Sequence, residues 1–213
     1  MTAEVFVITV SAAFLLATIA LFISTLSLVR GGAPYIGSPD KVVQAMVRQA
    51  DIQPGEKVYD LGCGDARLLI AAQRQCQAII GIGIDISGTL LSLAWLRSKT
   101  WRSPLKLIRG NIIDIDFSDA DVVFCYLMPE LLAKMDGKLR ALKPGTRIIS
   151  HQFELVGWQP VAERVVSYPP FLKTLREYRI GLPMIKTPPG ALAEDPLRRR
   201  IKQHARNYGD YEL

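Results

Sequence analysis

A glycine-rich turn between a buried strand and a helix constrains the fold of this chain more than any other feature. The segment runs Lys57-Val58-Tyr59-Asp60-Leu61-Gly62-Cys63-Gly64-Asp65-Ala66-Arg67, and its apolar start predicts the end of a central parallel strand. Gly62 and Gly64 allow backbone angles, and a close approach to a ligand, that a Cβ atom would forbid. The helix that follows presents free N–H groups to an anionic group in the turn. We therefore expect the turn to bind a nucleotide-like cofactor.

A second strand, expected over residues 78–84, ends in an acid at the distance such a fold requires. Asp85 follows it directly, where a carboxylate would accept hydrogen bonds from both hydroxyls of a cofactor ribose. A dinucleotide fingerprint, G-x-G-x-x-G, would place its third glycine at position 67, but Arg67 stands there. The pattern therefore favours a nucleoside cofactor other than a dinucleotide.

Strands and helices alternate through the middle of the chain. Helices are expected at 40–50, 68–76, 89–99 and from Pro129 to before Lys143, and further strands at 106–112, 121–127, 146–151, 161–167 and 175–180. Ser38 is the expected N-cap of the first helix, with Pro39 at its first position. Repeated strand–crossover–strand units predict an α/β fold with a doubly wound, mostly parallel sheet, whose ligand site lies at the carboxyl ends of the strands.

The N-terminal segment 5–29 contains no charged residue. As a helix rising about 1.5 Å per residue, it is long enough to cross a hydrocarbon core of roughly 30 Å. A cleaved signal peptide would have a basic start and a shorter apolar core, whereas this chain begins Met-Thr-Ala-Glu; a buried globular helix is the other alternative. We expect a single-pass membrane anchor, and the basic residues that follow it place the rest of the chain on the cytoplasmic side, or on the matrix or cytosolic side in an organelle.

These features divide the chain into an anchor (5–29), a linker and helix (30–50), an α/β domain (51–182) and a basic tail (183–213). The three cysteines have no metal-like spacing and suit a reducing compartment. The net charge of +6 is compatible with nucleic acid, but anionic lipid beside an anchored domain explains it more simply. We expect a membrane as partner, and no nucleic acid or metal.

The form D-x-G-x-G, with an acid closing the next strand, resembles the first two motifs of the class I S-adenosylmethionine-dependent methyltransferases. The resemblance implies a Rossmann-like sheet of seven strands, with an antiparallel pair at one edge. Gly62 and Gly64 would line the methionine part of S-adenosyl-L-methionine, Asp60 would help to hold its amino group, and Asp85 would bind its ribose.

The same resemblance places an adenine-binding residue after the third strand. Asn111 stands where this family usually has an acid facing the adenine amino group, and its amide oxygen can still accept that hydrogen bond. Ile86 and Ile112 would supply apolar walls for the adenine ring, although either can equally be ordinary core.

The methyl acceptor should lie at the end of the fourth strand, where the chain reads Cys125-Tyr126-Leu127-Met128-Pro129-Glu130. The Asn/Asp-Pro-Pro-Tyr motif of enzymes that methylate adenine or glutamine is absent, which disfavours those substrates. A lysine acceptor must be neutral to attack, and Tyr126 and Glu130 are candidates to orient it and to help move its proton. Core packing for Tyr126 and a favourable helix-terminal charge for Glu130 are the alternatives. His151 could serve as a base, but a structural role is the more common one.

The whole arrangement resembles a narrower family. The chain is similar to the family containing the lysine methyltransferases of the ATP synthase c-subunit and of the adenine nucleotide translocase. The similarity lies in the apolar N-terminus, the linker with Pro34-Tyr35-Ile36 and Ser38-Pro39, the motif at 60–67, the Tyr-Leu-Met-Pro-Glu stretch and the segment 143–151 with Trp158. Cys63 and Ala66 depart from it, since relatives tend to have Ser and Gly there.

The resemblance implies N-methylation of a lysine on a membrane protein. A methyltransferase for a quinone, a lipid or another lipophilic small molecule is the nearest alternative. A non-catalytic, membrane-tethered binding module that kept the fold is the other.

Overall fold

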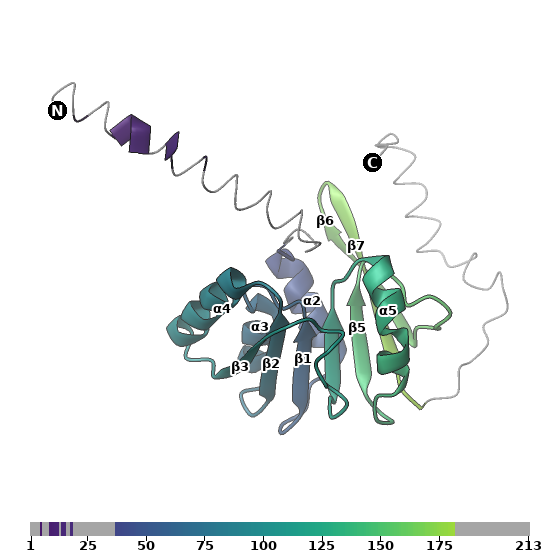
Figure 1. Cartoon of the computed structure of the whole chain (residues 1–213). Helices are drawn as coiled ribbons and strands as arrows, with labels where there is room; N and C mark the ends of the chain where they lie inside the picture. The colour runs from purple at the N-terminus through teal and green to yellow at the C-terminus, as the bar shows by residue number, and fades with distance from the viewer. Residues whose placement is uncertain (1–4, 6–8, 13, 16–17, 19–36, 182–213) are drawn as a thin grey trace.

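The computed structural model describes residues 37–181, together with residues 5, 9–12, 14, 15 and 18 near the N-terminus (Figure 1). Those N-terminal residues are helical, and their apolar members Val5, Val10, Phe14 and Leu15 are exposed. No helix within the described residues is long and apolar enough to span a bilayer. Most of the expected anchor (5–29), most of the linker and the whole basic tail (183–213) lie outside the described residues.

The centre of the molecule is a sheet of seven strands in the order β3-β2-β1-β4-β5-β7-β6. The strands are β1 (Lys57–Leu61), β2 (Ile80–Asp85), β3 (Leu105–Arg109), β4 (Val122–Cys125), β5 (Arg147–His151), β6 (Ala162–Tyr168) and β7 (Phe171–Arg179). Neighbours from β3 to β5 are parallel, whereas β7 is antiparallel to both β5 and β6. The doubly wound sheet with an antiparallel edge pair is therefore confirmed.

Helices cover both faces of the sheet (Figure 1). They are α2 (Asp40–Ala50), α3 (Arg67–Gln75), α4 (Gly88–Thr100) and α5 (Pro129–Arg140). Buried residues of α2 and α3 share one core cluster with Val122 and Phe124, whereas residues of α5 share the other with Val123 and Cys125. Alternate residues of β4 thus point to opposite faces, as the two-residue period of a strand requires, and a strand buried on both faces is apolar throughout.

The structure corrects three expected element boundaries. Ser38 does not cap the first helix: Pro39 occupies the N-cap position without a side-chain hydrogen bond, and its carbonyl oxygen accepts from the N–H groups of Val42 and Val43. The third strand ends at Arg109 instead of reaching residue 112, because Asn111 starts a turn. The last strand begins at Phe171, four residues earlier than expected, because β6 and β7 pair in register up to Tyr168 and Phe171.

Candidate functional site

The predicted site residues follow neighbouring strands at their carboxyl ends. Leu61 of β1 is paired with Ile84 of β2 on one side and with Cys125 of β4 on the other. Gly62 and Tyr126 therefore leave the sheet at the edge where Asp85 ends β2. β1 is the strand at which the chain order reverses, and ligands of doubly wound sheets bind at such a switch point.

The backbone of the glycine turn is held close to β2. The N–H groups of Gly62 and Cys63 both donate to the carbonyl oxygen of Ile84, at 2.9 and 3.0 Å. Gly62 has φ +79°, and a Cβ atom there would lie 3.3 Å from Cδ2 of Leu127. Gly64, at φ +54°, is also in the left-handed region. The turn therefore needs glycine for conformation at both positions, and at Gly62 for space as well.

Asp85 connects the end of β2 to the glycine turn. Its Oδ2 accepts a hydrogen bond from the N–H of Gly64 at 2.9 Å, and its Oδ1 accepts one from the N–H of Ser87 at 2.8 Å. A carboxylate has about four acceptor positions, so two hydrogen bonds leave it able to accept from a ligand. The acid is therefore fixed in orientation beside the turn, a role that the sequence did not predict.

Asp60 is a buried carboxyl group that lies among other acids. Asp60 is 6% exposed, and among the described residues no hydrogen bond offsets the effect of burial on its pKa. Burial, with the nearby carboxylates of Asp85 and Asp65, raises the pKa of Asp60 to about 8. A cationic group placed here would favour the ionised form. The environment of Asp60 thus fits the amino group of S-adenosylmethionine.

Asp65 belongs to an ion-pair network that the sequence analysis missed. This carboxylate, 2% exposed, pairs with the guanidinium groups of Arg67 and Arg97. Nη1 of Arg67 also donates to the carbonyl oxygen of Ser38 at 3.0 Å. The network therefore joins the glycine turn to α4 and to the segment before α2.

The residues expected around adenine have different environments. Asn111 is exposed, and its Oδ1 accepts from the N–H of Ile113 at 3.1 Å. Ile86, next to Asp85, is 62% exposed, whereas Ile112 is buried in the core cluster of α5. Ile86 is therefore free to cover a ligand ring, and Ile112 is mainly a core residue at the same end of the sheet.

Three aromatic side chains lie together where β4 and β5 end. The ring of Tyr126 packs on that of His151 with 4.0 Å between centroids, and Phe153 lies 6.2 Å from Tyr126. His151 is buried, and Nδ1 lies 3.2 Å from Oγ of Ser38. Burial, together with Lys173, lowers the pKa of His151 to about 4, so this ring is neutral near pH 7. Burial also raises the pKa of Tyr126.

Glu130 is exposed in the first turn of α5, where its charge is favourable to the helix dipole. The structure thus places it at the start of the helix that follows β4, four residues after Tyr126. Within the described part of the chain, no hydrogen bond or ion pair of Glu130 distinguishes a role toward the substrate from the electrostatic one.

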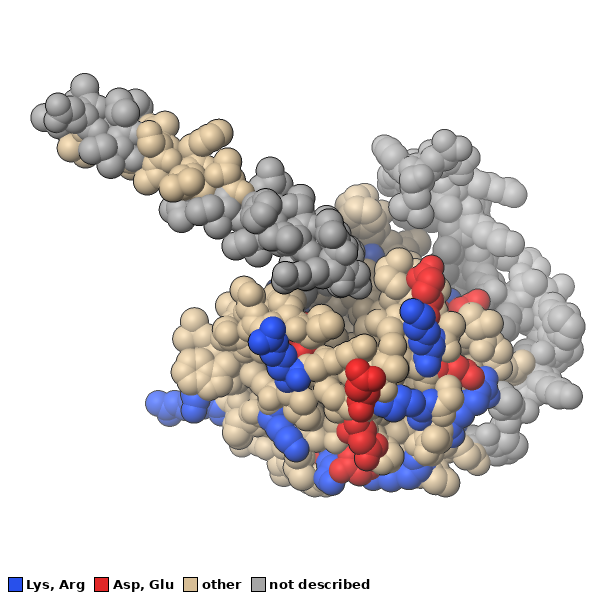
Figure 2. Space-filling model, viewed as in Figure 1, with Lys and Arg blue, Asp and Glu red and all other residues tan. Residues whose placement is uncertain are grey.

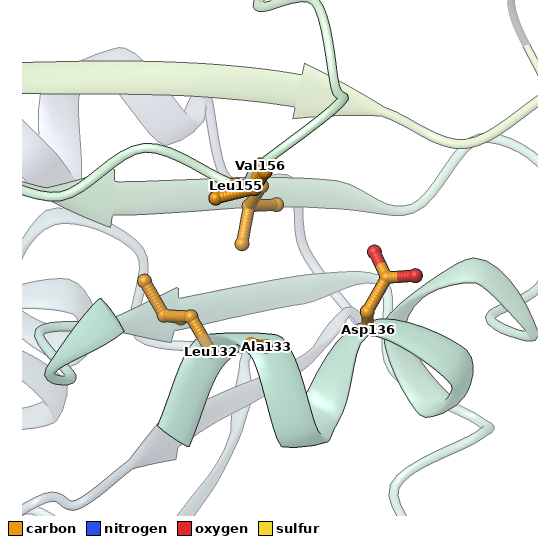
Figure 3. Close-up of a pocket in the computed structure, with 5 residues that line it drawn as sticks. All are labelled: Leu132, Ala133, Asp136, Leu155 and Val156. Atoms are coloured by element: carbon orange, nitrogen blue, oxygen red, sulfur yellow. The ribbon is translucent and has the colours of Figure 1, made fainter. Parts of the chain in front are cut away.

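A hollow of about 240 Å³ lies between α5 and the segment after β5 (Figure 3). Leu132, Ala133 and Asp136 of α5 face Leu155 and Val156 across it. None of the predicted site residues lines it, so this hollow is separate from the strand ends that carry the expected chemistry.

Similarity to known proteins shows to which family this chain belongs. A family model, the ANTKMT methyltransferase domain, matches residues 60–162. A protein-lysine N-methyltransferase of Saccharolobus islandicus is 35% identical over 130 residues, which cover 60% of this chain and 81% of the relative. The chain belongs to this methyltransferase family. It is an S-adenosylmethionine-dependent enzyme, which decides against the non-catalytic binding module.

Two further similarities define the range of the family. The adenine nucleotide translocase lysine N-methyltransferase of Mus musculus is 33% identical over 134 residues, covering 61% of this chain and 57% of that protein. An RNA methyltransferase of Salinibacter ruber, solved with S-adenosyl-L-homocysteine, is 31% identical, with a TM-score of 0.63 over 71% of this chain and 97% of the other. The named acceptors of these two proteins differ, since one is a lysine methyltransferase and the other an RNA methyltransferase.

Proposed function

We propose that this family member is a membrane-anchored protein-lysine N-methyltransferase that modifies a lysine of a membrane protein close to the lipid surface. The observation that carries the lysine assignment is Tyr126, which leaves β4 beside the glycine turn with its ring packed on a neutral His151. Two similar proteins named as lysine methyltransferases support it.

The cofactor side of the site would hold S-adenosylmethionine through Asp60, the glycine turn and Asp85, with Ile86 and Asn111 toward the adenine. When bound, this cofactor supplies a methyl group on a positively charged sulfur. Asp60 would pair with its amino group, and Asp85 would accept from its ribose hydroxyls. The role of the chain here is to fix position and to exclude water.

The acceptor side would act on the lysine amine. A lysine arrives mainly as an ammonium ion, which the exposed Glu130 carboxylate would attract. The amine must lose a proton to solvent before its nitrogen can form the new bond to the methyl carbon, while the carbon–sulfur bond breaks. Like any tyrosine near neutral pH, Tyr126 keeps its hydroxyl proton, and burial raises its pKa further. Its oxygen can accept from the amine and orient the nitrogen lone pair.

A bilayer location rests on residues 5–29, which carry no charge in the sequence. The described residues of that segment are helical, and their apolar side chains are exposed. We propose a single-pass anchor with the catalytic domain on the cytoplasmic side, or the matrix or cytosolic side in an organelle. A lysine near the bilayer surface would then be within reach of the site.

Methyl transfer into membranes tests this function. Membranes from a deletion strain would be incubated with the full chain and S-adenosylmethionine labelled in its methyl group, and protein would then be separated from lipid. We expect label on lysine residues of a membrane protein and none with an Asp85→Asn variant. Label in the lipid fraction would identify a lipophilic acceptor, and label in added RNA an RNA methyltransferase; either result contradicts the lysine assignment.

A further inference from the structure

Helix α4 leaves an apolar face without a partner in the described structure. Its buried residues are Leu91, Ala94 and Ser98, whereas Leu93, Trp95 and Leu96 are 44 to 57% exposed. Trp101, directly after the helix, is 53% exposed. A soluble surface rarely gathers large apolar side chains in this way unless it contacts something.

Every charged residue in the same stretch of chain is basic. Between residues 88 and 109 there is no Asp or Glu, but there are five cations, Arg97, Lys99, Arg102, Lys106 and Arg109. Arg97 is paired with Asp65, and the other four cations are exposed, as the apolar side chains are. Lys and Arg side chains, drawn blue in Figure 2, project from the part of the surface where Figure 1 places α4.

The two exposed tryptophans each have a cation beside the ring. The guanidinium carbon of Arg74 lies 3.6 Å from the centroid of the Trp101 ring, and Nζ of Lys99 lies 5.7 Å from that of Trp95. An open hollow between α4 and the edge strand β3 is lined by Leu91, Trp95, Leu96, Leu107 and Arg109, among others. We call the exposed side chains Leu93, Trp95, Leu96, Lys99, Trp101 and Arg102 the α4 face.

We propose that the α4 face docks on the surface of a bilayer that contains anionic lipid. Indole rings prefer the boundary between headgroups and acyl chains, where leucines can insert. Lysine and arginine beside them keep their charges at the level of the phosphates. Single-stranded RNA would also be attracted by this charge, but the exposed Leu93 and Leu96 beside the rings favour contact with acyl chains.

Docking of the α4 face would orient the catalytic end of the domain. Ser87 caps α4 by accepting from the N–H of Leu90 with its Oγ, and its own N–H donates to Asp85. The start of the helix is therefore tied to the candidate ribose-binding acid. This inference deepens the proposed function and depends on its bilayer location, but not on which acceptor is methylated.

The tryptophans themselves report this contact. The chain has three, and Trp158, the third, is half-buried and donates to Asp136. A Trp158→Phe variant of the full chain emits only from Trp95 and Trp101. It would be reconstituted into vesicles of phosphatidylcholine and phosphatidylglycerol that carry brominated acyl chains. We expect a loss of emission of about twofold or more, which weakens at about 0.5 M salt because the attraction is screened.

Three further variants separate docking from mere proximity to the anchor. Lys99→Glu with Arg102→Glu should reduce the quenching to the level found in vesicles of phosphatidylcholine alone, whereas Lys134→Glu, on exposed α5, should leave it unchanged. A Trp95→Phe, Trp101→Phe chain, which emits only from Trp158, should not be quenched. Flotation with neutral vesicles measures the anchor separately, and calorimetry with S-adenosylhomocysteine measures the cofactor site. Failure of docking is thus distinguishable from failure of the proposed function.

Several results would overturn the proposal. Unquenched emission of Trp95 and Trp101 in membrane-bound protein would do so, as would equal quenching in neutral vesicles or after the charge reversal. Blue-shifted emission that vesicles leave unchanged would mean that another part of the chain, or a second copy, covers the α4 face. Quenching by a single-stranded RNA oligomer but not by vesicles would assign the surface to nucleic acid.

Discussion

The carboxylate of Asp85 accepts a hydrogen bond from the backbone N–H of Gly64, with 2.9 Å between Oδ2 and N. The turn after β1 and the end of β2 are thereby fixed to each other, and Oδ1 binds the N–H of Ser87 at the start of α4. One side chain therefore holds the turn in place and keeps acceptor positions for the ribose that we propose it binds. Such a group needs little rearrangement when a ligand binds.

Replacement of Asp85 by Asn should weaken cofactor binding more than it weakens the fold. The amide keeps one acceptor oxygen but places an NH₂ group against one of the two backbone donors, and it removes the negative charge. We expect the affinity for S-adenosylhomocysteine, measured by calorimetry, to fall by at least about tenfold, because charge-assisted hydrogen bonds are lost.

Asp116→Asn is a matched control for this substitution. Asp116 also accepts from the N–H of a serine two residues later, Ser118, at 2.9 Å, but it lies in an exposed turn. Its replacement should leave the affinity unchanged. Equal affinities for the wild type and the Asp85→Asn variant would show that the ribose lies elsewhere.

Substitution of two glycines by alanine distinguishes the effect of backbone strain from the effect of steric crowding. Gly55 and Gly62 have φ of +86° and +79°, but a Cβ atom at Gly55 would have no atom within 4 Å. Gly55→Ala should therefore lower the free energy of unfolding by about 1 kcal/mol through strain alone, with normal activity. Gly62→Ala should cost more, since Leu127 must also move, and should reduce cofactor affinity.

Urea titrations and calorimetry of both variants measure these two effects. A Gly62→Ala protein that binds S-adenosylhomocysteine as well as the Gly55→Ala protein would contradict the placement of the methionine part over this turn.

The elements that the sequence predicted correctly are those with local signals. β1, β4 and β5 are short apolar runs between turn residues, and the period of α2 gives its bounds, 40–50, without error. The alternation of strands and helices then decides the sheet, because crossover connections allow few arrangements. The residues of the glycine turn could be predicted from the residues next to them in the sequence alone.

Long-range contacts were not predictable in this way. Ser38 has the sequence signal of an N-cap, but its Oγ lies beside His151, 113 residues away, and its carbonyl oxygen binds Arg67. Asp65 has a charged partner two residues along the chain and another at Arg97, on a different helix. Such partners depend on how the elements pack, which the sequence pattern alone does not specify.

The buried carboxyl of Asp60 should make stability depend on pH. Its pKa is about 8 in the folded protein, against an ordinary value of 3.8, so between these values the folded state holds a proton that the unfolded chain has released. Stability therefore falls as the pH rises through this window and levels off above it. His151, whose pKa is lowered to about 4, has the opposite effect below its ordinary value of 6.5.

Between pH 6.5 and 8, the pH dependence of stability therefore reflects the ionisation of Asp60 and not that of His151. We expect the free energy of unfolding, from urea titrations, to decrease by about 2 kcal/mol over this range. Asp60→Asn cannot ionise, so its stability should be flatter with pH, while its affinity for S-adenosylhomocysteine should fall. Parallel pH profiles for the two proteins would mean that Asp60 is already ionised in the fold.

The hydroxyl of Tyr126 can be removed without removing its ring. In Tyr126→Phe the ring can keep its packing on His151, 4.0 Å between centroids, so the fold and the cofactor site should be retained. If the hydroxyl orients the lysine nitrogen, kcat should fall by at least about tenfold, with an unchanged affinity for S-adenosylhomocysteine, because only the positioning of the acceptor is lost. Tyr168→Phe, on the exposed β6–β7 hairpin, provides the control for loss of a phenol group elsewhere. Single-turnover methylation of the membrane substrate measures the effect, and a Tyr126→Phe enzyme as fast as that control would assign this tyrosine to packing alone.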